Sequence, residues 1–378
     1  MKRIYLDYNA TTPLNPEVLE SMLPWLRESF GNPSSAHASG RCAAAAVDRS
    51  RIQVAELIDA NADEIIFTSG ATEANNTIIA HADGKIVAGG GEHSSVYEPA
   101  LAAGAVFLPL TRNGQLLQDA LKKALEQHSP ALVSLILANN ETGVITNLDG
   151  VAKLVHDAGA LLHLDAVQAV GKIPVNVQEL NADFLSLSAH KIYGPKGVGA
   201  LFVRRGIKLK PLIRGGGQEG NRRSGTHNVP AIVGMGVACT IARRKIDQYK
   251  EHCSALLEHL ENQILKKIPD VTINGANEPR VPNTLNVSFT GLDAGLIATR
   301  LDMAGIEVSV GSACSSGRNS SSRVLEAMGL SRHESLGAIR FSLGWDNDAA
   351  MIDETVSKLA EIVETLRHAD QAANVIKF

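Results

Sequence analysis

Short apolar runs recur along the first half of this chain, and helical patterns lie between them. The runs are Glu64–Thr68, Leu132–Ala138, Leu161–Asp165 and Asp183–Ser188, and Leu148–Ala158 is a helical pattern between two of them. Such an alternation predicts an α/β protein with a parallel sheet and crossover helices. Ligands of such sheets bind outside the carboxyl ends of the strands. The residues that follow each run are therefore the first candidates for a functional site.

The second half of the chain changes character. Arg243–Lys267 has the pattern of a long amphipathic helix, whereas Ile268–Asn286 is proline-rich and predicted to be irregular. A length of 378 residues allows two or three domains. We predict a large domain over residues 15–255 and a small α+β domain made of residues 1–14 and 256–378.

Composition excludes several classes of protein. The net charge is −4 with a sequence pI of about 6.3, so nothing favours nucleic acid or an anionic membrane as a partner. The four cysteines are widely spaced, without a zinc-binding or disulfide pattern. No run approaches the roughly 20 apolar residues of a membrane helix, and MKRIYLDYN does not read as a secretory signal. We expect a cytoplasmic protein with reduced thiols and no resident metal.

The segment Ser186–Gly197, with the sequence SLSAHKIYGPKG, places a lysine directly after a buried strand. Lys191 at a strand end can form a Schiff base with a carbonyl cofactor, and the hydroxyl of Ser188 and the imidazole of His190 can bind a phosphate. The alternative is that Lys191 is a solvated loop charge, which is the usual state of a lysine.

Polar residues follow the other strands as well. Ser69-Gly70-Ala71-Thr72 opens a helix, whose N–H groups and dipole can bind an anion with help from the Thr72 hydroxyl. An ordinary capped helix is the alternative. In Asn139–Gly143, the amide of Asn140 can bind a carboxylate or a phenolic oxygen, although Asn and Gly are also common in turns.

Asp165 ends its strand, where a carboxylate is unusual unless it has a cationic partner. A protonated pyridine nitrogen is such a partner in pyridoxal-phosphate sites, and Gln168 can reach the phenolic oxygen of the same ring. His93 can stack on an aromatic cofactor and relay protons, or it is an ordinary turn histidine. His163 is predicted to be structural.

Taken together, ten motifs in collinear order resemble one family. They are YLDYNATTP, FGNPSSAH, TSGATEANN, GEH, NNETG, HLDAVQ, SLSAHKIYGPKG, GGGQEGNRRSGTHN, GSACSS and IRFSLG. The chain resembles the cysteine desulfurases, which are pyridoxal-phosphate enzymes of the class V aminotransferase superfamily with fold type I. The resemblance runs from Tyr5 to about Gly344, and it implies a large domain with a mostly parallel seven-stranded sheet.

The resemblance also implies a role for each matching residue. Lys191 would be the Schiff-base lysine, Asp165 would pair with the pyridine nitrogen, and His93 would stack on the ring. Gln168 would bond the phenolic oxygen, and Ala71 and Asn140 would also contact the cofactor. The phosphate would be held by Thr72, Ser188 and His190, together with Thr226 from the second subunit of a homodimer. Asn140 and Arg340 would hold the carboxylate of L-cysteine, and Asn32 would lie near the same substrate region.

Cys314 separates the members of the superfamily. Its surroundings, GSACSSG, are too rich in glycine and serine for a core, so we expect an exposed, mobile thiol. The resemblance implies that Cys314 takes sulfur from cysteine as a persulfide, releases L-alanine and passes the sulfur to an acceptor protein. That acceptor would be an iron–sulfur scaffold or a thio-modification enzyme, and Cys314 could become a transient iron–sulfur ligand.

A thiol with a pKa of about 8.5 is mostly protonated at neutral pH, so it needs a base, and His93 is our hypothesis for it. Cys42, Cys239 and Cys253 are assigned structural roles. The alternative functions are a selenocysteine lyase, another class V aminotransferase, or a sulfur-relay or scaffold protein without catalysis. The joint presence of Lys191 and Asp165 argues against the last of these.

Overall fold

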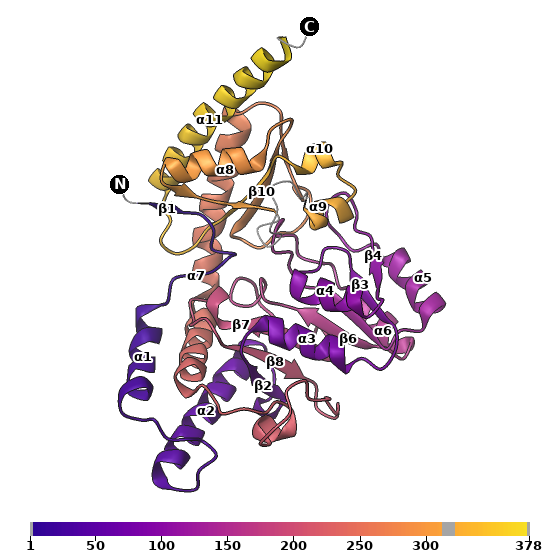
Figure 1. Cartoon of the computed structure of the whole chain (residues 1–378), viewed down its shortest axis with the longest axis vertical. Coiled ribbons are helices and arrows are strands. Elements are labelled where there is room, and N and C mark those ends of the chain that lie inside the picture. Colours follow the sequence, from indigo (N-terminus) through magenta and orange to yellow (C-terminus); the bar gives the residue numbers. More distant parts are fainter. Residues whose placement is uncertain (1–2, 312–321, 376–378) are drawn as a thin grey trace.

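A seven-stranded sheet forms the centre of the larger part of the molecule (Figure 1). The structure is a computed structural model that describes residues 3–311 and 322–375. The strand order is β2-β8-β7-β6-β5-β3-β4, and β8 alone runs antiparallel to its neighbours within this sheet. The strands are β2 (Ile65–Thr68), β3 (Ile86–Gly89), β4 (Val106–Leu108), β5 (Leu132–Ile136), β6 (Leu161–Asp165), β7 (Phe184–Ser188) and β8 (Gly199–Val203). The prediction of a mostly parallel seven-stranded sheet is confirmed.

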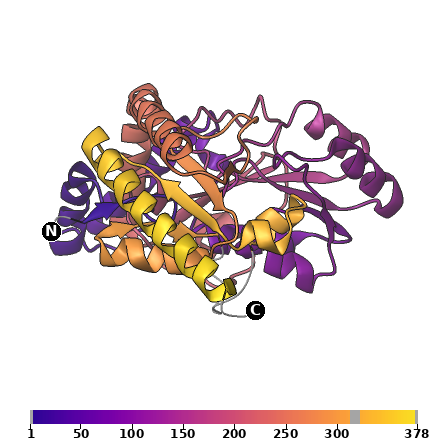
Figure 2. The same ribbon diagram turned by 90° about the horizontal axis from the view of Figure 1, so that it is seen from above.

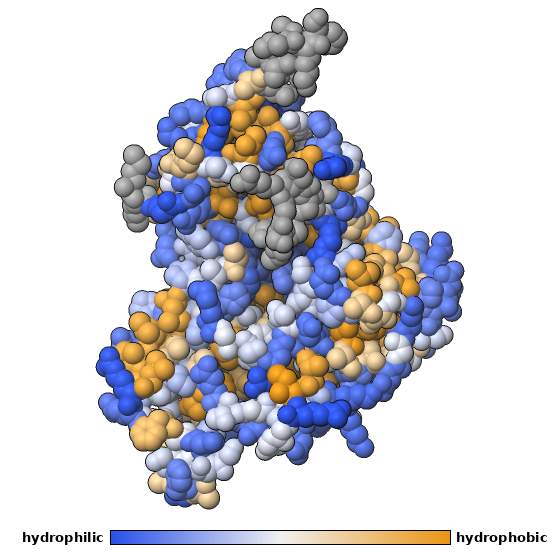
Figure 3. Space-filling view, viewed as in Figure 1, coloured by the Kyte–Doolittle hydropathy of each residue, from blue (hydrophilic) through white to orange (hydrophobic). Residues whose placement is uncertain are grey.

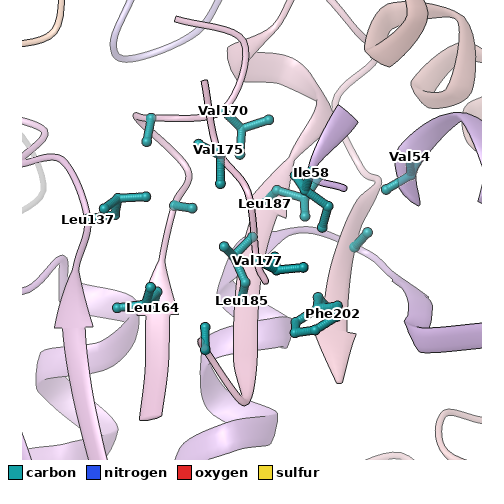
Figure 4. Packing of buried hydrophobic residues seen from close by; sticks show 14 of the residues in the cluster. Val54, Ile58, Leu137, Leu164, Val170, Val175, Val177, Leu185, Leu187 and Phe202 are labelled. Carbon is teal, nitrogen blue, oxygen red and sulfur yellow. The ribbon is translucent and has the colours of Figure 1, made fainter. Parts of the chain in front are cut away.

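Helices cover both faces of this sheet, which explains why its strands are apolar throughout rather than alternating. One face packs against α2 (Ala38–Leu57), α5 (Gln118–His128), α6 (Val151–Asp157) and the first half of α7 (Val229–Lys267). The other face packs against α3 (Ala71–His81) and α4 (Ser94–Ala102). Figure 4 shows the first of these cores, where Ile58, which directly follows α2, lies near Leu187 of the sheet, and Val177 lies near Leu185.

A smaller antiparallel sheet forms the centre of the other part, with the order β12-β13-β10-β9. Figure 2 shows α11 lying across this part of the molecule. Its elements are β9 (Val271–Ile273), β10 (Thr284–Phe289), α8 (Ala294–Met303), β12 (Ser309–Val310), α9 (Arg323–Ala327), α10 (Arg332–Ser335), β13 (Ala338–Ser342) and α11 (Ala349–Val375). β1 (Ile4–Tyr5) adds the N-terminal segment by pairing with β11 (Ile306–Glu307).

Two local predictions need correction. Residues 268–286 are not wholly irregular, because β9 and the start of β10 lie there and β10 pairs with β13 from Thr284 onward. The long helix begins at Val229 rather than at Arg243, after an Asn228 side chain that accepts from Ala231 N. Its first half is buried among other helices and strands, so it has no polar face from which an amphipathic pattern could arise.

α7 links the two hydrophobic cores. Its residues up to Ile241 belong to the core of the large sheet, and those from Tyr249 to Ile264 belong to the core around β10 and β13. At a rise of 1.5 Å per residue, its 39 residues span about 58 Å. The predicted domain boundary at residue 255 falls inside this helix and stays a prediction.

Candidate active site

A cavity of about 910 Å³ opens at the carboxyl ends of the strands of the large sheet. It is closed on the other side by Ser309, Val310 and Gly311 and by Arg340 of β13. Most of the predicted site residues meet in it: Ala71, Thr72, His93, Asn140, Asp165, Gln168, Ser188, His190, Lys191 and Arg340. Asn32 and Thr226 are exposed and do not line this cavity, and Cys314 lies outside the described residues.

Lys191 is placed by the short helical turn Ala189–Lys191, which follows β7 directly. Its Nζ donates to the backbone carbonyl oxygens of Asn9 and Ala10, at 2.5 and 2.8 Å. The N-terminal segment therefore orients the lysine. Lys196 also lines the cavity, but it is exposed.

Asp165 lies at the end of β6 and is only 3% exposed. Its Oδ2 accepts from Asn75 Nδ2 at 2.8 Å, and its Oδ1 accepts from the backbone N–H of Val167 at 3.1 Å. Within residues 3–311 and 322–375, no arginine, lysine or histidine forms a salt bridge with this carboxylate. A buried carboxylate of this kind is suited to a cationic ligand in the cavity.

Glu92 is a second carboxyl group in the cavity wall, and it was not predicted from the sequence. Its Oε1 accepts from Ile136 N at 2.7 Å, whereas its buried Oε2 has no hydrogen-bond partner among the described residues. Burial raises the pKa of Glu92 well above its usual value, and the nearby Asp165 raises it further. These surroundings therefore favour the protonated form of the Glu92 carboxyl group.

Another part of the cavity wall is suited to an anion. α3 begins after Gly70 without a side-chain cap, so the N–H groups of its first turn, which includes Ala71 and Thr72, stay available. Ser188 and His190 line the same cavity. Burial, followed by the charge of Lys191, lowers the pKa of His190 to about 4, so its imidazole is neutral.

His93 forms the N-cap of α4. Its Nδ1 accepts from Ser95 N at 3.1 Å and lies 2.8 Å from Ser95 Oγ. Burial lowers the pKa of His93, although Asp165 opposes the shift, so the ring is neutral. Because Nδ1 accepts a backbone N–H, the ring hydrogen resides on Nε2. This tautomer suits stacking and donation from Nε2. The hypothesis that His93 is the base for Cys314 stays untested.

Arg340 and Asn140 meet across the boundary between the two sheets. Arg340 Nη1 donates to the backbone oxygen of Asn140 at 2.9 Å, and Nη2 pairs with Asp7. Arg340 Nε and Asn140 Oδ1 are buried. Neither atom has a hydrogen-bond partner in the described part of the chain. A small carboxylate with an adjacent amine would supply an acceptor and a donor to these two atoms.

Sequence reasoning missed several residues that hold this site together. Asn9 is buried, and its backbone oxygen accepts from both Lys191 and Gln168. Glu141 lines the cavity, and Lys172, which lies behind the cavity wall, donates to Gln168.

His163 is structural as predicted, since it is fully buried between Ser134 and Ser186. No group of three or more His, Cys, Asp or Glu side chains in the described residues is arranged to hold a metal.

The fold and this cavity define an α/β protein of the class V aminotransferase type. The family described as Aminotransferase class-V matches residues 4–355, which is most of the chain. A curated relative from Dictyoglomus turgidum, named cysteine desulfurase IscS, is 45% identical over 97% of this chain and 96% of its own length. The chain therefore belongs to the cysteine desulfurases.

Solved structures agree with this family. A NifS-like protein from Rickettsia africae is 35% identical, covers 96% of this chain and 99% of its own, and superposes with a TM-score of 0.89. A structure described as SspA in complex with cysteine is 33% identical, with a TM-score of 0.78 over 90% of this chain and 99% of its own. None of the helices in residues 3–311 and 322–375 is long and apolar enough to cross a membrane.

Proposed function

We propose that this chain is a pyridoxal-phosphate-dependent desulfurase that converts L-cysteine to L-alanine and keeps the sulfur as a persulfide on Cys314. The observation that carries the proposal is the presence, in one cavity, of the Lys191 amine and of the buried Asp165 carboxylate, which forms no salt bridge within the described residues. The names of the relatives favour cysteine desulfurase over selenocysteine lyase or a transaminating enzyme of the same class.

The residues present fit the cofactor. The uncapped start of α3, with Thr72, Ser188 and His190, provides donors for a phosphate, and Asp165 provides the charge for a protonated ring nitrogen. Gln168 and His93 line the same cavity, and we assign Gln168 to the ring oxygen and His93 to stacking on the ring. When bound, pyridoxal phosphate supplies a sink for the electron pair left behind when the Cα–H bond of the substrate breaks.

The remaining chemistry belongs to the side chains. The Lys191 amine would take the Cα proton of the substrate and return it to the substrate skeleton. Arg340 holds the substrate carboxylate, with Asn140 beside it. The Cys314 thiolate attacks the substrate sulfur, so that the carbon–sulfur bond breaks as the sulfur–sulfur bond forms. Cysteine and an enzyme thiol thereby become alanine and an enzyme persulfide, and the atoms balance without another oxidant or reductant.

Several finer proposals accompany this one. We propose a homodimer, a sulfur-acceptor protein and a cytoplasmic location, since a persulfide-forming thiol needs a reducing compartment. The acceptor class, an iron–sulfur scaffold or a thio-modification enzyme, is proposed from the family alone. The proposed role of Cys314 is supported by Ser309, Val310 and Gly311, which line the cavity and directly precede the segment that contains Cys314.

The test is Cys314→Ser. The variant should keep the visible absorbance of the lysine-linked cofactor and still change its spectrum when cysteine is added. It should form almost no alanine, because a serine hydroxyl cannot accept sulfur as a persulfide. Labelled cysteine should leave one reductant-releasable sulfur on the wild type and none on the variant. Undiminished alanine formation by Cys314→Ser would overturn the mechanism and favour a lyase or a transaminating enzyme.

A further inference from the structure

Lys172 is a buried lysine that lies behind the cavity rather than in its wall. The residue is 3% exposed, and it lies in the turn segment that follows β6 and that also contains Gln168. Its Nζ donates to Gln168 Oε1 at 2.5 Å and to Asn9 Oδ1 at 2.7 Å. In the described residues, no aspartate or glutamate forms a salt bridge with it. A buried lysine without an anion is costly, so its position calls for an explanation.

The surroundings favour the uncharged amine. Burial lowers the pKa of Lys172 well below its usual value, and the positive charges of Lys191 and Arg340 lower it further. Among the groups with the largest effects, Cys253 alone raises the pKa of Lys172. An uncharged amine has two N–H donors, and two amide oxygens accept from this nitrogen. The hydrogen-bonding capacity of Lys172 as a donor is thus satisfied.

These two bonds fix the orientation of Gln168. An amide side chain can present either its oxygen or its nitrogen to a ligand, and the two ends have nearly the same shape. Here Oε1 is occupied by Lys172, while Nε2 donates to the backbone oxygen of Asn9 at 3.0 Å. The second N–H of Nε2 has no acceptor among the described residues, and Gln168 lines the cavity.

We propose that Lys172 is a positioning residue, which holds the Gln168 amide so that its nitrogen, and not its oxygen, meets the ring oxygen of the cofactor. The inference rests on the proposed function, because it requires the lysine-linked cofactor. Lys172 also fixes the side chain of Asn9, whose backbone oxygen accepts from Lys191. One buried amine thus restrains two residues that contact the reacting centre.

A spectroscopic signature follows from this arrangement. A donor on the ring oxygen withdraws negative charge, and that charge otherwise helps to hold a proton on the nitrogen that joins Lys191 to the cofactor. Loss of the donor should therefore raise the pKa of that linking nitrogen. We expect Lys172→Met to raise it by about half a unit to one unit, which corresponds to one hydrogen bond.

The experiment is a pH titration of the visible absorbance of the holoenzyme, together with a measurement of cofactor affinity. Gln168→Leu should give the same upward shift as Lys172→Met, and the double variant should shift no further than Gln168→Leu alone. Lys245→Met is the matched control. Lys172 and Lys245 both line a second, small cavity behind Lys191, but Lys245 is exposed and lies over the Trp345 ring. It should titrate as the wild type does.

The outcomes separate this inference from the proposed function. If the wild type shows no visible absorbance with pyridoxal phosphate, the proposed function fails. If the wild type titrates and Lys172→Met titrates identically, or if Lys172→Met adds its full shift to Gln168→Leu, the positioning role is wrong. Should Lys172→Met lose its far-ultraviolet circular dichroism, Lys172→Gln, which keeps an amide donor, carries the test. It should shift less than Gln168→Leu, and an equal shift would contradict the proposal.

Discussion

The carboxyl group of Glu141 has two available charge states near neutral pH. Its side chain lines the cavity and is 8% exposed, and Ser322 Oγ donates to its Oε2 at 2.5 Å. Burial raises the pKa of Glu141 to about 7, while Ser322, Arg340 and Arg323 oppose the shift. The same Ser322 hydroxyl accepts from Leu325 N at the start of α9. The ionisation of Glu141 is thereby coupled to the packing of α9 in the smaller part of the molecule.

The folded protein should therefore lose stability as the pH rises from about 4.5 to about 7 on account of Glu141. In this window the folded state keeps a proton that the unfolded state has released, so the slope of stability against pH is negative. Between pH 5 and pH 8, the wild type should lose about 1–3 kcal/mol more than Glu141→Gln. Urea unfolding of the cofactor-free protein at both values measures the difference.

Glu354→Gln is the control for this prediction, because Glu354 is exposed on α11. Its unfolding midpoints should follow those of the wild type at both pH values. Parallel curves for the wild type and Glu141→Gln would contradict the raised pKa of Glu141 in the folded state.

Residues that follow a strand were predictable, and those that reach the site from elsewhere were not. Asp165 and Lys191 each follow a buried run, so the topology rule for α/β sheets placed both at one edge. Asn9 reaches the site from a segment 159 positions before Gln168, and no local sequence pattern predicts such a long-range contact. Glu92 was not selected from the sequence, because the feature that distinguishes it is its burial beside Asp165 in the folded chain.

Among the elements, α7 is the one whose length was predicted least accurately from the sequence. Periodicity identifies a helix only where one side is polar, and the first half of α7 is covered by α1 (Pro16–Arg27), α2 and the large sheet. The same close packing explains Gly236. A Cβ added there would lie 2.8 Å from Ser50 Cα, which is a backbone atom of α2, and would also meet Gln53.

Gly236→Ala should therefore destabilise the protein, although the same change usually stabilises a helix by about 1 kcal/mol. The Ser50 backbone cannot yield without moving α2, and overpacking of this kind costs about 1–3 kcal/mol. The free energy of unfolding in urea measures the net loss. Gly234→Ala is the matched control, because its nearest contact would be the flexible thioether of Met22 at 2.7 Å, and the closest rigid atom, Pro195 Cδ, would lie 3.1 Å away. A smaller loss for Gly236→Ala than for Gly234→Ala would contradict the packing argument.

At the scale of the whole molecule, two features lie on the surface and take no part in the cavity of a single chain. The loop from Gly215 to Asn228 is anchored by Glu219, which pairs with Arg51 and His227, yet it leaves Thr226 exposed. Exposed apolar side chains gather around α1, where Figure 3 shows a hydrophobic area at the lower left. Leu19 is 42% and Leu26 is 61% exposed there. Both features are suited to a second copy of the chain.

If Thr226 completes the phosphate site of a partner subunit, mixed dimers should recover function that neither variant has alone. In a dimer of one Lys191→Ala subunit with one Thr226→Ala subunit, one site lacks both groups and the other lacks neither. After subunit exchange at equal concentrations, half of the dimers are mixed, so about a quarter of all sites should be intact. The readout is the lysine-linked absorbance at limiting pyridoxal phosphate, compared with each variant kept separate. A mixture that equals the average of the separate variants would place Thr226 in the site of its own chain.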